Sequence, residues 1–100
     1  MIVRRLDEVT GTDRNVQGDG WNSRRMVVAA DRVDFSMHDT LMEAGTETDI
    51  AYPHHLEGAY CIEGEGELVH LATGESHAIE PGTVYILDKH DHVRLRARTA

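Results

Sequence analysis

Polar and apolar residues alternate along much of this chain, in short runs that are separated by turn residues. The runs recur at the spacing of roughly 8–12 residues that is typical of β-sandwiches and barrels. No segment has apolar residues at helical spacing over a length that favours a helix. The pattern predicts an all-β protein with a hairpin that turns at ATGE, and its expected strands are 24–30, 35–42, 57–64, 83–88 and 93–97.

The segment GTETDIAYPHHLEGAYCIEGEG contains part of a frame that is common in small metal-binding β-barrels of the cupin kind. In that frame a glycine is followed by a His-x-His pair, a glutamate and a turn glycine. Gly45, Glu57 and Gly64 fit, but Ala51 and Pro53 stand where the two histidines are expected. The frame therefore supports the fold and argues against a three-histidine metal site.

A second cupin motif follows in the right order. Gly74 and Gly82 fit its glycines, and Tyr85 occupies its histidine position. Together the two motifs predict a cupin-type double-stranded β-helix, which is a jelly-roll barrel, over residues 1–100 as a single domain.

Composition narrows the functional classes. The net charge of −8 argues against a nucleic-acid partner, because phosphates would repel the chain. The single cysteine, Cys61, cannot form an internal disulfide and is expected to be a small buried hydrophobe. No apolar run is long enough for a signal peptide or a membrane span, so a cytoplasmic protein without a membrane partner is expected. A chain this short buries a modest share of its surface, which makes a partner subunit plausible.

Several longer motifs go beyond the fold. The segments WNSRRMV, GTET, YCIEGEGE, PGTVYILDKHD and LRA together resemble the L-ectoine synthase family of cupins, and the resemblance covers essentially the whole chain. It implies a hydro-lyase that cyclises N4-acetyl-L-2,4-diaminobutanoate to ectoine, a compatible solute, with loss of water. The related enzymes are dimers, so a homodimer is expected.

The resemblance also implies an Fe(II) or similar divalent ion held by a glutamate, a tyrosine and a histidine. Glu57 and Tyr85 match the first two positions. Carboxylate and phenolate oxygens are hard donors that suit iron or manganese. From the residues alone, Glu57 could equally be a solvent-facing strand residue, and Tyr85 a core aromatic with its hydroxyl satisfied.

The third ligand is less clear. The family's histidine falls at Val93, and His92 lies one place earlier. A shift of one residue moves a strand side chain to the opposite face, so alternation predicts that His92 points outward. His92 is assigned as the third ligand on the condition that a bulge before the strand re-aims it, and His90 is the next candidate.

The resemblance also marks a substrate pocket and a catalytic pair. Tyr85 and His55 are the candidate catalytic residues, whereas His70 and His77 are expected to be exposed. Arg25 either binds a substrate carboxylate or is a solvated cation. The polar face of strand 35–42 either lines a ligand cavity or faces solvent. The residues that match the family's substrate pocket are Trp21, Arg25, His38, Thr40 and Tyr52.

Members of the family continue past the position of Ala100, through a further strand and an acidic tail that contains a histidine. The barrel is therefore expected to be incomplete at its C-terminal end, with an unpaired sheet edge. Three functions remain open on the sequence: an ectoine synthase-like enzyme; a non-catalytic small-molecule-binding or truncated, inactive cupin from that family; and a different cupin enzyme acting on a sugar or small acid.

Overall fold

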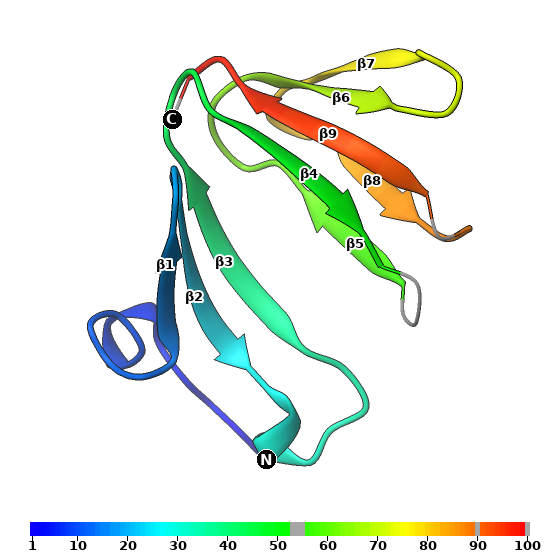
Figure 1. The fold of residues 1–100 in the computed structure, drawn as a ribbon. Helices are drawn as coiled ribbons and strands as arrows, with labels where there is room; N and C mark the ends of the chain where they lie inside the picture. Colours follow the sequence, from blue (N-terminus) through cyan, green and yellow to red (C-terminus); the bar gives the residue numbers. More distant parts are fainter. Residues whose placement is uncertain (53–55, 90, 100) are drawn as a thin grey trace. The chain divides into compact units, whose positions relative to one another are not determined.

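A computed structural model describes residues 1–52, 56–89 and 91–99 of the chain (Figure 1). Its described part consists of antiparallel β-strands and two single-turn 3-10 helices, which confirms the all-β prediction. The chain divides into two compact units, residues 1–42 and 43–100, and each is described by itself. No helix in the described ranges has the length and apolar character needed to cross a bilayer.

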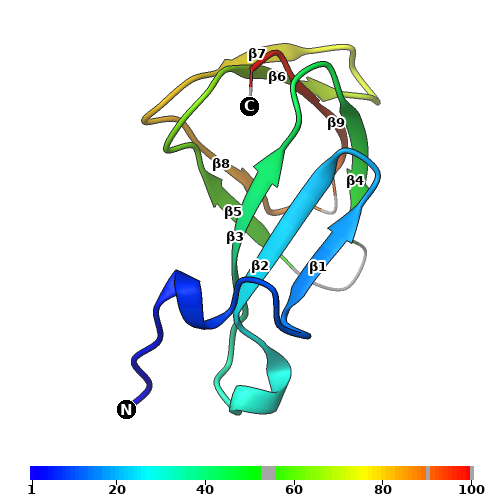
Figure 2. The same ribbon diagram turned by 90° about the vertical axis from the view of Figure 1, so that its left-hand side faces the viewer.

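The first unit is a three-stranded sheet with strand order β1-β2-β3 (Figure 2). The hairpin between its first two strands turns at Asp19 and Gly20, where Gly20 has a φ of 79° that favours glycine. The elements of this unit are η1 (Leu6–Glu8), β1 (Asn15–Gly18), β2 (Trp21–Val27), η2 (Ala29–Asp31) and β3 (Met37–Met42).

The strand expected at 24–30 begins and ends three residues earlier than predicted. It ends at Val27 because the next residues form η2, and Arg32, which follows η2, adopts a left-handed φ of 59°. Hydrogen bonds to the side chain of Asp31 hold this turn. The Asp31 carboxylate accepts hydrogen bonds from the Arg14 guanidinium at 2.9 Å, from Arg4 at 3.2 and 3.3 Å, and from the Val28 backbone N–H at 2.9 Å. Two charged donors on one carboxylate fix the connection between β2 and β3.

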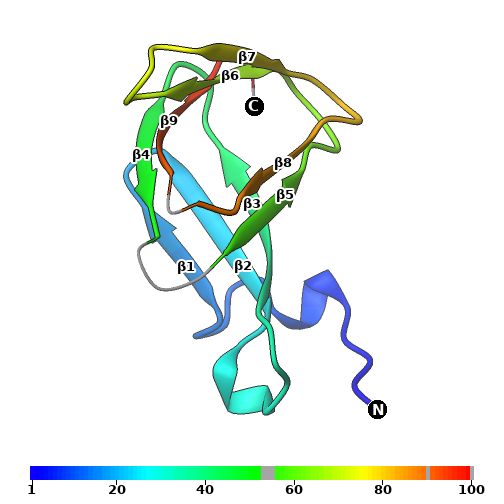
Figure 3. The same ribbon diagram turned by 90° about the vertical axis from the view of Figure 1, so that its right-hand side faces the viewer.

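The second unit contains a four-stranded sheet of order β4-β9-β6-β7 and a two-stranded sheet of order β5-β8 (Figure 3). Leu68, Ile79 and Val93 from the larger sheet pack with Leu87 from the smaller sheet in one buried cluster. The apolar face of each sheet is thereby covered by the other. The strands are β4 (Glu47–Ala51), β5 (Glu57–Tyr60), β6 (Gly66–His70), β7 (Ser76–Ile79), β8 (Val84–Leu87) and β9 (His92–Ala97).

The hairpin predicted within residues 64–82 is confirmed as β6 and β7, which are joined across the ATGE segment. The strand expected at 57–64 already ends at Tyr60. β1 and β4 were not predicted. Each has too few apolar residues for alternation to be visible, and both are held by pairing with neighbouring strands.

Arginines of β9 alternate with its apolar residues and point away from the core. Arg94 bonds Asp49 of β4 at 2.7 Å, and Arg96 lies 3.0 Å from Glu47 and 3.2 Å from Glu67 of β6. These cross-strand ion pairs occupy the outer face of the larger sheet. The inner face of β9 is thereby left to its apolar residues.

Candidate functional site

Glu57 and Tyr85 lie on neighbouring strands of the two-stranded sheet. Glu57 opposes Leu87 and Ala59 opposes Tyr85, so the two site residues share one face as diagonal neighbours. That face is the inner one, because Leu87 belongs to the buried cluster and Tyr85 packs against it. Glu57 is half-buried rather than solvent-facing. The pairing of β5 with β8 thus brings together two residues that are far apart in sequence.

Tyr52, which follows β4, joins this pair. Its hydroxyl is close enough to the Glu57 carboxylate for the two groups to interact, and its ring packs against the buried cluster. Burial and the negative charge of Glu57 raise the pKa of Tyr52. Burial, followed by the charge of Glu57, also raises the pKa of Tyr85 far above its usual range. Both phenols therefore remain protonated at neutral pH, and each hydroxyl is able to donate a hydrogen bond beside a carboxylate.

The structure does not bring His92 to this group. Val93 is 2% exposed and belongs to the buried cluster, whereas His92 is exposed and lies near Asp49 on the outer face. The register between β4 and β9 runs from His92 to Arg96 without a shift. The strand therefore contains no bulge that would re-aim His92, and the condition for its assignment as a ligand is not met.

A divalent metal fits this arrangement only in part. Glu57 and Tyr85 are the oxygen donors that a hard cation prefers. The described residues contain no group of three or more His, Cys, Asp or Glu side chains that could hold a metal. Because His92 faces outward, the three-residue set of Glu57, Tyr85 and His92 is not assembled. His55 and His90, the other histidines considered for the site, lie outside the described residues.

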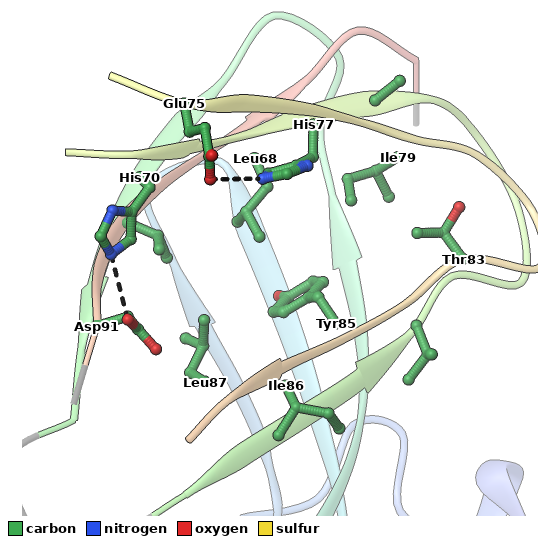
Figure 4. A pocket seen from close by; sticks show the side chains of 13 residues that line it. Leu68, His70, Glu75, His77, Ile79, Thr83, Tyr85, Ile86, Leu87 and Asp91 are labelled. Atoms are coloured by element: carbon green, nitrogen blue, oxygen red, sulfur yellow. Dashed lines mark hydrogen bonds and ion pairs between the residues drawn. The ribbon is translucent and has the colours of Figure 1, made fainter. Parts of the chain in front are cut away.

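A pocket of about 410 Å³ opens beside Tyr85 in the second unit (Figure 4). Apolar side chains, among them Leu87 and Val93, line much of it, and two histidines lie at its polar edge. His77 is exposed as predicted, and its Nε2 lies 3.4 Å from a Glu75 carboxylate oxygen. An apolar pocket with a few polar groups is typical of a small-molecule site.

His70 is only partly exposed, contrary to the prediction. Its Nε2 lies 3.1 Å from Asp91 Oδ1, and its Nδ1 lies 3.0 Å from Thr73 Oγ1. Sequence alternation could have revealed its inward direction, because His70 lies two residues after the buried Leu68 on the same strand.

The first unit carries four of the five predicted substrate residues, all on one face of its sheet. Arg25 of β2 opposes His38 of β3, and Thr40 opposes Ser23, which lies between Trp21 and Arg25 on the same face of β2. Directly paired residues share a face, so cross-strand pairing places these polar side chains together.

Arg25 and His38 give this face a cationic character. Arg25 Nε is buried and has no hydrogen-bond partner among the described residues. Shielding from solvent, followed by the charge of Arg25, lowers the pKa of His38, although the residue as a whole is exposed. By contrast, Arg24 on the opposite face of the sheet pairs with Asp39. The predicted face therefore offers a guanidinium that is not neutralised by a described carboxylate, which suits an anionic ligand.

Comparisons with known proteins give one consistent result. The family model described as ectoine synthase matches residues 1–100. The L-ectoine synthase of Hahella chejuensis is 53% identical over 97 residues, which cover 97% of this chain and 74% of that protein. The L-ectoine synthase of Thermobifida fusca is 48% identical over 99 residues, which cover 99% of this chain and 74% of that protein.

Solved structures agree. A crystal structure of ectoine synthase from P. lautus superimposes with a TM-score of 0.95 at 47% identity and covers 99% of this chain and 71% of that chain. The match confirms the predicted cupin fold, and this chain is shorter than the proteins it matches. On the sequence match over its full length and on the shared fold, the chain belongs to the ectoine synthase family.

Proposed function

We propose that this chain is a hydro-lyase that forms ectoine from N4-acetyl-L-2,4-diaminobutanoate. In this reaction the α-amine attacks the carbonyl carbon of the acetamide, a C–N bond forms, and the carbonyl oxygen leaves as water to give a cyclic amidine. The observation that carries the proposal is the identity of about one residue in two with L-ectoine synthases over nearly the whole chain.

The inner-face residues suit both charge changes of this reaction. Tyr85 stays protonated, so its hydroxyl can donate a hydrogen bond to the carbonyl oxygen as negative charge develops there. The Glu57 carboxylate, which lies beside Tyr52, stabilises the positive charge that develops on the attacking amine. In the first unit, Arg25 is proposed to bind the substrate carboxylate, and Trp21, His38 and Thr40 to contact the substrate. His55 remains a candidate for proton transfer.

The substitution Tyr85→Phe tests the proposed role of the hydroxyl, since it keeps the ring that packs on the core. General acid and hydrogen-bond donors each contribute about 10²–10⁴-fold, so kcat is expected to fall by that order while the protein stays folded. The control is Tyr60→Phe, because Tyr60 is exposed on the outer face of the adjoining strand and its kcat should be unchanged. An equal loss in both variants would exclude a specific role for Tyr85.

A divalent ion such as Fe(II) is also proposed, with Glu57 and Tyr85 as its oxygen ligands. Tyr85 would bind the ion as a phenolate, so this role is an alternative to the hydrogen-bond donation described above. When bound, such an ion polarises a carbonyl as a Lewis acid. Since the third ligand is not assembled in the described residues, no step above depends on the ion.

A second candidate is a cupin that binds a small molecule without turnover. The specific observation in its favour is Val93, an apolar core residue at the position where the resemblance implies a metal-binding histidine. This candidate predicts that the acetylated diamine raises the Tm but is recovered unchanged.

Assembly as a homodimer and a cytoplasmic location are proposed as well. The dimer is supported by the many exposed apolar side chains of the described residues, such as Phe35 and Leu41. Light scattering during size-exclusion chromatography measures the mass directly.

A further inference from the structure

The inner face presents two oxygen donors, Glu57 and Tyr85, and it has a valine, Val93, at the position where the family resemblance implies a metal-binding histidine. Val93 lines the same pocket as Tyr85, and both Tyr85 and Tyr52 pack against the buried cluster to which Val93 belongs. The valine side chain has no lone pair to donate to a cation. Its Cβ already points to the inner face, since Val93 is 2% exposed and opposes Ile50 of β4 and His70 of β6.

None of the described histidines around this position replaces it. His77 of β7 lines the pocket, but it is exposed and its Nε2 lies 3.4 Å from a Glu75 carboxylate oxygen. His92 faces outward in an unshifted register, so reaching the inner face would require breaking the β4–β9 ladder. His70 faces inward, but Asp91 and Thr73 engage both of its ring nitrogens. A metal would have to displace one of these partners before His70 could bind it. The described residues thus supply an incomplete set of ligands around Glu57 and Tyr85.

We propose that Val93 removes the imidazole ligand from this site, so that the chain binds a divalent metal only weakly, and that the single change Val93→His completes a three-ligand centre. The inference rests on the proposed function only in assigning the metal to the same site as the reaction. Even a group that merely orients a ligand changes metal affinity by about 10–100-fold. A third direct ligand should therefore tighten binding by at least about tenfold.

The test uses Co(II) and Fe(II) as probes, each added alone to the metal-free protein under anaerobic conditions. Affinity is measured by competition with a chelator, and the visible absorption of Co(II) reports the number and type of ligands independently of turnover. The wild-type chain should bind weakly, and Val93→His should bind at least about tenfold more tightly with a changed Co(II) spectrum. Val93→Leu is the matched apolar control and should leave the affinity unchanged. The double variant Val93→His/Glu57→Gln should lose the gain.

Two results would overturn the inference. One is tight binding by the wild-type chain that is lost in His92→Ala, His90→Ala or His55→Ala, because another histidine would then complete the site. The other is a folded Val93→His variant, as judged by circular dichroism, with no gain in affinity. If Val93→His does not fold, the wild-type affinity decides: weak binding that is insensitive to the three histidine variants supports the inference, and tight binding refutes it.

The same variant separates this inference from the proposed function. Higher metal affinity in Val93→His without any cyclised product would refute the reaction and leave the metal inference intact. Cyclised product without a gain in metal affinity would refute the metal inference and support the proposed reaction.

Discussion

Leu87→Ala and Ile86→Ala test the assignment of the inner face of the β5-β8 sheet. The two residues are neighbours on β8, but Leu87 is 5% exposed within the buried cluster, whereas Ile86 is 55% exposed on the outer face. Burying a Leu side chain contributes about 1.5–3 kcal/mol, and the cavity left by its loss brings Leu→Ala costs to about 2–5 kcal/mol. Leu87 already borders the pocket beside Tyr85, so the new cavity adds less than in a closed core. We expect a loss of about 2–3 kcal/mol for Leu87→Ala.

Ile86→Ala serves as the matched control. It removes an apolar side chain that is about half exposed to solvent, so the free energy of unfolding is expected to fall by about 1 kcal/mol or less. Urea unfolding followed by far-UV circular dichroism measures both values, provided that the slope of free energy against urea is the same in all three proteins. Equal losses, or a larger loss for Ile86→Ala, would show that the inner and outer faces of β8 have been exchanged.

Two further predictions concern the backbone and pH. Asp31→Asn should lower the free energy of unfolding at neutral pH and make it fall less steeply on acidification. Hydrogen bonds from Arg14 and Arg4 depress the pKa of Asp31. The stabilisation by the ionised carboxylate is therefore present above the unfolded pKa of about 3.9 and is lost as the pH falls below it. Thermal unfolding between pH 2 and 7 measures the Tm of both proteins. Parallel curves of Tm against pH would show that the ion pairs of Asp31 do not cause the loss of stability in acid. Gly66→Ala should destabilise strongly, because its Cβ would overlap the backbone carbonyl of Arg96, while Gly58→Ala meets only the flexible end of Ile86 at 3.1 Å. Similar Tm values for the two alanine variants would contradict the close approach at Gly66.

Local alternation predicted much of the fold. The apolar and charged residues of β9 were correctly divided between its two faces, so Val93 is buried and His92 exposed. The ATGE hairpin followed from turn chemistry alone. β4 was missed because ETDIA has few apolar residues, and its strand conformation depends on pairing with β9. Such pairing is not visible in a local window of sequence.

The site was predicted less completely. Glu57 and Tyr85 came from the resemblance to a family, and only the register of β5 against β8 shows that they share a face. The interaction between Tyr52 and Glu57 had no signal in the sequence, because neither residue type nor spacing indicates that these two side chains come together. His70 was assigned to the surface because of its proximity to a turn, although its strand parity points inward.

The proposed reaction is tested most directly by incubating the purified, folded chain with N4-acetyl-L-2,4-diaminobutanoate and following the formation of the cyclic amidine by NMR. Cyclisation is expected with wild-type protein and should fall by about 10²–10⁴-fold in Tyr85→Phe. If neither the wild-type chain with added Fe(II) nor metal-loaded Val93→His forms the ring, this member of the family has a binding role and not a catalytic one.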